Sequence, residues 1–452
     1  MMTSRRYASK MTLLSVCFGL FMIQLDLTVV NVALKSIQDN LHADVAALQW
    51  VVDAYAILFS SLMLTTGDLG DIFGRRRIYT SGMVLFVLGS IACASAPSYV
   101  FLIVARSLQG IGAAAVLPNS LAILRNAFPD ARLRARAIGW WAGVSGLAVV
   151  AGPTLGGWLV GTFGWRSVFW INVPVGVLGL WLILGFVSES SHPQGRKLDI
   201  WGQVLAASAL ASLIFAVIEG QSLGWGNILV IVVFAWAVMS GVVLYVFEQR
   251  HAHPMLDFRF FRQPIFTAAN AASGLMNFGV FATLFAFSLY LLHIQQLSPE
   301  QVGLRLVVMF APFALSLPFG GRITGHFGSR YPAALGLGAT GAGMLLLCLV
   351  PLLADDVLMF LALFIIGLGL AAATPALVSA AIGALPPERS GAASAFNNTS
   401  RQAGGALGVA LLGGLVGVGA SLSSEGVVTA IFGSAVALLL GSFISWRFIH
   451  TD

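Results

Sequence analysis

Long apolar runs recur from one end of the chain to the other, and they constrain its fold more than any other feature. In a helix, about 20 apolar residues cross the ~30 Å hydrocarbon core of a bilayer. Because lipid offers the backbone no hydrogen-bonding partner, runs of this length are expected to be helical. We therefore predict an all-α polytopic membrane protein with fourteen transmembrane helices, at residues 11–34, 48–66, 78–97, 99–126, 136–162, 167–187, 199–219, 226–247, 264–292, 301–320, 332–353, 357–382, 389–418 and 427–448.

The composition excludes several other classes of protein. Of the 452 residues, 58% are hydrophobic and 9% are charged, whereas soluble domains have about 25% charged residues. Cys17, Cys93 and Cys348 lie in apolar runs without paired spacing, which favours buried thiols over a disulfide or a metal site. The sequence has no Walker loop, metal-ligand cluster or nucleophile elbow. We therefore expect no enzyme activity, no cofactor and no metal.

The basic residues predict the orientation in the membrane. The net charge is +6, but the lysines and arginines are scattered over short loops, which does not indicate nucleic-acid binding. If the N-terminus is cytoplasmic, most of the 24 lysines and arginines fall in cytoplasmic segments, with Lys35, Arg166 and Arg305 outside. The positive-inside rule therefore predicts that both termini are cytoplasmic.

Two polar connectors, at 188–198 and 248–263, bracket the seventh and eighth spans. The predicted domains are a six-helix bundle at 1–190, two extra transmembrane helices with linkers at 191–260, and a second six-helix bundle at 261–452. GDLGDIFGRRR at 67–77 and GRITGHFGSR at 321–330 share the frame G-x-[L/I]-x-x-x-F-G-x-R. Such parallel repeats build secondary transporters whose substrate cavity lies between the halves, near mid-membrane.

Three ionisable residues lie at similar depth in different spans. Asp26 lies ~12 Å from the outer end of the first span, and Asp53 and Arg106 lie ~8 Å and ~11 Å into the second and fourth. Buried charges are costly unless they are paired or face water, so intramembrane ionisable residues usually mark function. We expect these three residues to couple transport to protons. Either Asp26 or Asp53 could carry the proton while the other meets a cationic substrate.

Further polar residues are candidates for the substrate site. Gln109 lies one turn from Arg106 and could support it. Arg401 lies ~18 Å into the thirteenth span from the cytoplasmic side, and Asn397 precedes it by one turn. Each of these last two could face the cavity or bridge helices. Glu219, at the end of the seventh span, is expected to be a solvated interfacial carboxylate.

The motifs resemble those of the major facilitator superfamily. GDLGDIFGRRR resembles its signature loop, although Ile72 stands where a basic residue is usual. RSLQGIGA, from Arg106, is similar to the fourth-helix motif, and GVSGLAVVAGPTLGG, from Gly143, to the fifth-helix motif of antiporters. LDLTVVNVAL, WVVDAY and SGAASAFNNTSRQAGG resemble segments of the fourteen-helix drug:proton antiporters (QacA/EmrB type).

The residues of the signature loop also have roles that follow from their physical properties. Gly67 and Gly74 allow close helix approach and a tight turn, while Asp71 can cap the next helix or pair with an arginine. The resemblance implies that Gly67, Asp71, Gly74, Arg75 and Arg76 form a latch that stabilises one conformation. The second copy has Gly325 in place of the aspartate.

The fifth span carries an antiporter-type motif rich in small residues. Gly152, Gly156 and Gly157 permit close helix contact, and Pro153 removes a backbone hydrogen bond and bends the helix. Tight packing here would seal the interface between the halves against proton leak.

The resemblance implies a proton-driven multidrug efflux antiporter. It would export amphipathic or cationic drug-like compounds by alternating access, as a monomer in the lipid bilayer of a bacterial inner membrane. Two alternatives stay open: an exporter or symporter of one specific metabolite or antibiotic, and a non-transporting membrane sensor with the same fold.

Overall fold

The computed structural model describes residues 2–128, 130–191, 199–250, 258–353, 355–385, 390–418 and 421–450. Residues 192–198 and 251–257 of the two expected connectors lie outside the described residues. The first seven helices are α1 (Met2–Leu41), α2 (Val45–Phe73), α3 (Arg75–Ala94), α4 (Tyr99–Ala127), α5 (Ala131–Phe163), α6 (Ser167–Trp170) and α7 (Asn172–Phe186). The hairpin of α8 (Ile200–Ser222) and α9 (Ile228–Arg250) follows, with the 3-10 helix η1 (Phe258–Arg262).

The remaining elements form a second group of helices. They are α10 (Pro264–Leu289), the π-helix η2 (Tyr290–Ile294), α11 (Pro299–Phe327), α12 (Arg330–Leu347), α13 (Val350–Leu353), α14 (Asp356–Gly383), α15 (Ser390–Gly413), the 3-10 helix η4 (Gly414–Val416) and α16 (Ser424–Phe448). A two-residue antiparallel pair, β1 (Gly417–Val418) with β2 (Ser421–Leu422), precedes α16.

Short polar caps start many of these helices. The side chains of Asp44, Ser98, Asp130 and Asp199 accept hydrogen bonds from the first-turn N–H groups of α2, α4, α5 and α8. Ser298 and Gln301 form a reciprocal capping box at α11. Such caps satisfy backbone donors that no intrahelical carbonyl can reach. They explain why loops of a few residues suffice between long apolar helices.

Thirteen helices within the described residues are long and apolar enough to cross a membrane. This confirms the all-α, multi-pass prediction, but it does not confirm the count of fourteen. The expected span at 389–418 corresponds to α15, which is not among the thirteen. Polar side chains from Asn397 to Gln402 run through its middle, and α15 packs against α2, α8, α10 and α14. The fourteenth span therefore stays a prediction.

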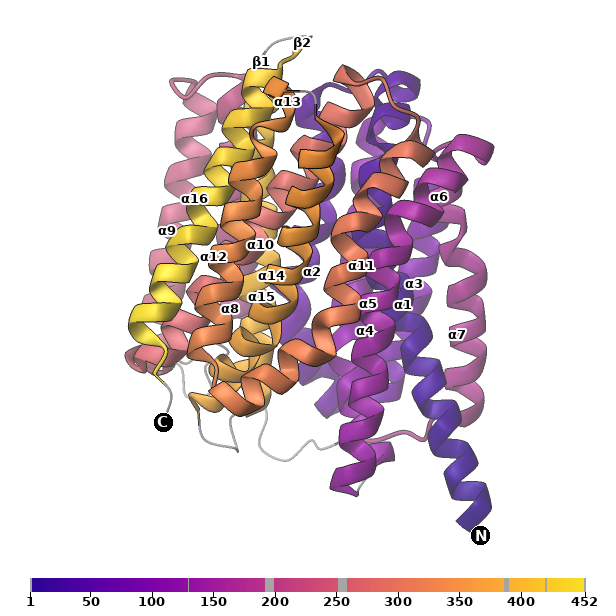
Figure 1. The fold of residues 1–452 in the computed structure, drawn as a ribbon. Helices are drawn as coiled ribbons and strands as arrows, with labels where there is room; N and C mark the ends of the chain where they lie inside the picture. The colour runs from indigo at the N-terminus through magenta and orange to yellow at the C-terminus, as the bar shows by residue number, and fades with distance from the viewer. Residues whose placement is uncertain are drawn as a thin grey trace.

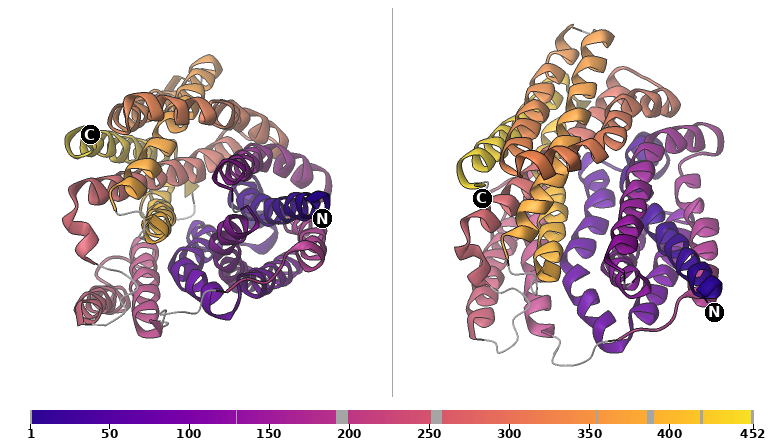
Figure 2. Two further views of the ribbon diagram at one scale, coloured as in Figure 1. Left: turned by 90° about the horizontal axis from the view of Figure 1, so that it is seen from below. Right: turned by 60° about the horizontal axis from the view of Figure 1, so that its bottom comes forward.

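Both termini lie at one end of the bundle, which we call the terminal end, and the other is the opposite end (Figure 1). Viewed from below, α1–α7 form one group and α10–α16 another, with α8 and α9 beside them (Figure 2). We call these groups the N-terminal and C-terminal halves. They meet where α5 packs on α11 and α2 packs on α15. The domain boundaries expected from the sequence remain predictions.

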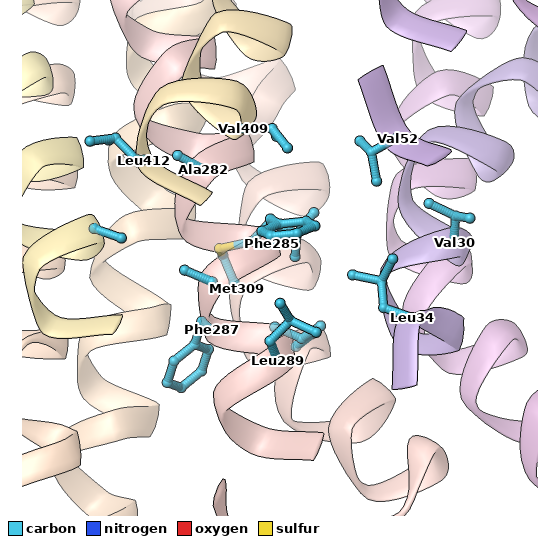
Figure 3. Packing of buried hydrophobic residues seen from close by; sticks show 14 of the residues in the cluster. Val30, Leu34, Val52, Ala282, Phe285, Phe287, Leu289, Met309, Val409 and Leu412 are labelled. Atoms are coloured by element: carbon cyan, nitrogen blue, oxygen red, sulfur yellow. The ribbon is translucent and has the colours of Figure 1, made fainter. Parts of the chain in front are cut away.

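The largest buried apolar cluster joins the two halves. Val30, Leu34 and Val52 come from α1 and α2, and they lie opposite side chains of α10 and α15 that include Phe285 and Val409 (Figure 3). Two polar contacts reinforce this region. Lys35 Nζ donates to Leu292 O at 2.8 Å, and Gln49 Nε2 donates to Val409 O at 2.8 Å. The halves are thus held together toward the opposite end.

Candidate functional site

A buried ion pair lies inside the N-terminal half. The Arg106 guanidinium on α4 pairs with the Asp26 carboxylate on α1, and both side chains are at most 1% exposed. Gln109 Oε1 accepts from the same guanidinium at 2.9 Å, and Gln109 Nε2 donates to Asp26 Oδ1 at 3.3 Å. Gln109 therefore supports both members of the pair, as its spacing from Arg106 suggests.

The surrounding helices complete the hydrogen bonding of this network. Asn172 Nδ2 on α7 donates to Asp26 Oδ1 at 3.1 Å, and Ser90 Oγ on α3 accepts from Gln109 Nε2 at 2.7 Å. Arg106 Nε donates to Val51 O at 3.0 Å. A buried ion pair is tolerated only when further hydrogen bonds replace the lost water. Four helices of one half supply those bonds, which fixes the position of the pair.

Asp53 occupies a different environment. It lies on α2, is fully buried, and neither carboxylate oxygen has a hydrogen-bond partner among the described residues. It lines a small cavity where α1, α2 and α4 face α10 and α15, and the cavity walls are Leu27, Val52, Ala56, Arg106, Phe281, Gln402, Gly405, Ala406 and Val409. The carboxylate therefore sits at the seam between the halves, in a mostly apolar site.

The three ionisable residues that were expected at similar depth thus have two different environments. Asp26 pairs with Arg106 inside the N-terminal half, whereas Asp53 faces the C-terminal half. Arg106 touches both environments, because it pairs with Asp26 and also lines the cavity beside Asp53. Asp53 is buried, so its carboxylate is not solvated in this conformation.

The C-terminal candidates take different positions. Asn397 is buried and donates from Nδ2 to Asn270 Oδ1 at 3.2 Å and to Ser273 Oγ at 2.9 Å. It therefore bridges α15 to α10 instead of lining the Asp53 cavity. Arg401 forms no ion pair with any described residue, and its neighbour Gln402 lines the cavity. Glu219 accepts from Trp50 Nε1 at 3.1 Å, which ties α8 to α2.

The signature loop folds as a tight turn between α2 and α3. Gly74 has φ +108°, a conformation that side-chain-bearing residues rarely adopt. Arg75 Nε donates to Asp71 Oδ1 at 3.0 Å, so Asp71 pairs with a nearby arginine and does not cap α3. Gly67 faces Pro118 of α4, and Arg76 reaches the Leu184 carbonyl of α7 at 2.6 Å.

Glu189, which follows α7, supplies the cap that Asp71 does not. Its Oε1 and Oε2 accept from the N–H groups of Arg76 and Arg77 at 3.0 and 3.2 Å. A carboxylate at a helix N-terminus is favoured by the exposed N–H groups and the helix dipole. The sequence shows Glu189 only as part of a polar connector, so nothing in it indicates contact with a loop more than 100 residues earlier.

The glycines of α5 serve two different contacts. A Cβ at Gly152 or Gly156 would collide with Thr28 or Val29 of α1. At Gly157 it would collide with the Pro299 carbonyl of α11, and at Gly303 on α11 with the Pro153 carbonyl. The helix is therefore pressed between its own half and the other half, as small residues permit.

Comparisons with known proteins agree with this architecture. The model of the Major Facilitator Superfamily matches residues 16–264 and 265–451. The chain is 38% identical to the multidrug resistance protein Stp of Mycobacterium tuberculosis, over 92% of this chain and 77% of that protein. It is 34% identical to a methylenomycin A resistance protein of Streptomyces coelicolor, over 95% and 90% of the two chains.

A solved structure supports the fold independently. The crystal structure of the peptide transporter POT in complex with sulfate superposes with a TM-score of 0.70 at 17% identity, and the match covers 96% of this chain and 93% of that one. At this identity the likeness concerns the fold alone.

Proposed function

The chain belongs to the Major Facilitator Superfamily, and on that premise we propose that it is a proton-driven exporter of amphipathic, cationic drug-like compounds. Relatives named for multidrug resistance and for resistance to methylenomycin A support export of small molecules. The relative named for a single antibiotic also favours a second candidate, an exporter dedicated to one compound. Proton coupling and the charge of the substrate rest on the chemistry of the site.

The observation that carries the proposal is the Asp53 carboxylate at the seam, which has no hydrogen-bond partner among the described residues. An isolated carboxylate in an apolar site costs several kcal/mol, by rough estimate, unless a proton or a cation accompanies it. A proton and a cationic compound therefore compete for the same group. Binding of one releases the other, which is the exchange that an antiporter requires.

The Asp26–Arg106 pair has a supporting role in this scheme. Asp26 is already neutralised by Arg106 and hydrogen-bonded by Gln109 and Asn172, so it has less need of a proton or a cation. Arg106 also lines the Asp53 cavity. A proton on Asp53 changes the electrostatic field at the Arg106 guanidinium. The Asp26–Arg106 ion pair can transmit that change to α1, α3 and α7, whose side chains belong to the same network. Proton coupling is thus assigned to Asp53, with Asp26 and Arg106 as positioning residues.

The cavity has a volume of only about 20 Å³, so a compound would enter it only after the halves move apart, when its apolar walls would contact the hydrophobic part of that compound. Both halves contribute apolar side chains to the cavity wall, among them Leu27, Phe281 and Val409. Gln402 adds a polar group. Ligand sites are typically apolar with a few placed polar groups. Because the walls come from both halves, movement of one half against the other changes the site, as alternating access requires.

We assign the conformation to the state open toward the terminal end, which the positive-inside rule places in the cytoplasm of a bacterial cell. Contacts of Lys35, Gln49 and Gly157 join the halves toward the opposite end.

Substitution of Asp53 tests the proposal. Purified protein is placed in liposomes with an imposed pH gradient, and the movement of a fluorescent lipophilic cation and of protons is followed. Asp53→Asn is expected to abolish both proton-driven cation export and cation-induced proton release. Asp53→Glu is expected to retain part of both, because the carboxylate is kept. Asp44→Asn is the matched control, since it removes a carboxylate from the start of the same helix while keeping a capping oxygen.

The two parts of the proposal fail separately. Proton-driven export by Asp53→Asn at the wild-type rate would overturn Asp53 as the coupling carboxylate. Export of neutral but not cationic compounds by the wild-type protein would overturn the substrate class while leaving proton coupling intact.

A further inference from the structure

A groove on the outer face of the C-terminal half has no part in the proposed transport site. It has a volume of about 400 Å³ and runs between α12 and α16, which lie next to each other on that face (Figure 1). Its walls include Leu335, Gly338 and Ala339 of α12 and Leu439, Phe443 and Trp446 of α16. Leu335 and Phe443 are 67% and 61% exposed, so the groove is open to the surrounding lipid.

Arg330 stands next to the groove, where α12 begins. Its Nε donates to the carbonyl of Trp446 at 2.9 Å, and its guanidinium lies 4.7 Å from the Trp446 ring centroid. The ring of Tyr331 packs against that of Trp446 at 5.7 Å. Tryptophan and tyrosine are enriched at the depth of the lipid headgroups. The charged group and its aromatic neighbours therefore mark the membrane–water interface at the terminal end.

The internal repeat shows why the charge of Arg330 is unusual. In the repeated frame Arg330 corresponds to Arg76, and each donates to a carbonyl in the last helix of its own half, at Trp446 and Leu184. The first copy has carboxylates close by, because Asp71 pairs with Arg75 and Glu189 caps α3. The second copy has Gly325 at the position of Asp71. No carboxylate among the described residues forms an ion pair with Arg330.

We propose that Arg330 and the α12–α16 groove bind an anionic phospholipid. The guanidinium N–H groups that donate to no described residue would hold the phosphate, a geometry to which arginine is suited. One acyl chain would lie in the groove against Leu335 and Phe443. The terminal end is the cytoplasmic end in the proposed orientation, and anionic lipids are abundant in that leaflet. In the first half, Asp71 and Glu189 would repel such a headgroup.

Lipid retention by the full-length protein tests this site without any transport measurement. The protein is purified in detergent, supplied with phosphatidylglycerol or phosphatidylcholine of identical chains, and examined by native mass spectrometry. The wild-type protein is expected to retain phosphatidylglycerol preferentially. Arg330→Gln is expected to lower that retention about fivefold, the effect of one basic residue near an anionic surface. Arg330→Lys is expected to retain most of the preference.

Two further variants separate the headgroup from the groove. Ala339→Trp fills the groove and is expected to reduce phospholipid retention while leaving Arg330 in place. Arg322→Gln is the matched control, because Arg322 is an arginine near the same end whose guanidinium lies 5.5 Å from the Phe319 ring centroid instead of beside the groove. It is expected to retain lipid like the wild type.

Three results would overturn the proposal. Equal retention of the two lipids by the wild-type protein is one, and it requires no variant to fold. Complete displacement of the lipid by inorganic phosphate would show that the arginine binds a free anion and that the groove contributes nothing. A change from two chains to one upon Ala339→Trp, without a change in lipid retention, would assign the groove to a second copy of the chain.

Discussion

The two halves share a repeated sequence frame, yet their buried polar networks differ in charge. The N-terminal half holds the Asp26–Arg106 ion pair. In the C-terminal half, the buried side chain of Asn397 on α15 is hydrogen-bonded to Asn270 and Ser273 on α10, and all three side chains are neutral. Neutral hydrogen bonds hold helices together at modest cost, whereas a buried ion pair carries a large desolvation penalty. The buried ion pair thus lies in the N-terminal half, whereas the charge of Arg401 on α15 forms no ion pair with any described residue.

Breaking the charged network is expected to have the largest effect on stability. Asp26→Asn leaves Arg106 buried without its counter-charge, which costs about 3–5 kcal/mol of unfolding free energy. Unfolding in mixed micelles measures the loss. By contrast, Asp53→Asn removes a carboxylate that has no hydrogen-bond partner in the described part of the chain, so it is expected to leave stability unchanged or to raise it. If the two variants were equally destabilised, the distinction between these carboxylates would be wrong.

A double variant isolates the pair itself. Asp26→Asn combined with Arg106→Gln removes both charges, and it is expected to be less destabilised than the sum of the single changes by about 0.5–3 kcal/mol. Strict additivity would mean that the two side chains do not stabilise each other. The Arg106→Gln single variant completes the double-mutant cycle.

Breaking the neutral hydrogen bonds of Asn397 is expected to lower the unfolding free energy by less than breaking the Asp26–Arg106 pair. Asn397→Ala leaves the Asn270 and Ser273 side chains without their partner, for about 1–3 kcal/mol of unfolding free energy. Because no charge is involved, proton-driven export corrected for folded protein should stay near the wild-type rate. Asn398→Ala is the matched control, since Asn398 donates to the Ser394 carbonyl of its own helix and to no other described residue. Loss of coupling in Asn397→Ala with the fold intact would place Asn397 in the transport site.

The smallest effect is expected at the signature loop. Glu189→Gln keeps an acceptor for the N–H groups of α3 but removes the negative charge, at a cost of about 0.3–1 kcal/mol at low salt. Because Glu189 is partly exposed, salt should screen most of the difference. Unfolding midpoints of wild type and variant are compared at low and high ionic strength. A difference that persists undiminished at high salt would assign Glu189 a role other than electrostatic capping.

The expected span boundaries agree with the observed helices to within several residues in most cases. Two spans are divided, because the helix at 167–187 is broken into α6 and α7 and the one at 332–353 into α12 and α13. A proline follows each break: Pro174 and Pro351 stand four residues after Trp170 and Leu347, the last residues of α6 and α12. Proline lacks the N–H that would bond to the carbonyl four residues earlier, and its ring clashes with that carbonyl. The contact between Arg106 and Gln109 follows from their spacing along one helix, which fixes a shared face. Asn172, Ser90 and Glu189 were missed because neutral or loop polar residues carry no such signal.

The sequence by itself determined the membrane class, the repeated halves and the depth of Asp26, Asp53 and Arg106. Depth follows from residue count, because a helix rises about 1.5 Å per residue and lipid leaves the chain no alternative to helices. Only the tertiary structure decided which way each side chain faces. The rotation of a helix about its axis is set by its packing against neighbours. That packing pairs Asp26 with Arg106 and leaves Asp53 at the seam without a hydrogen-bond partner among the residues that the structure describes.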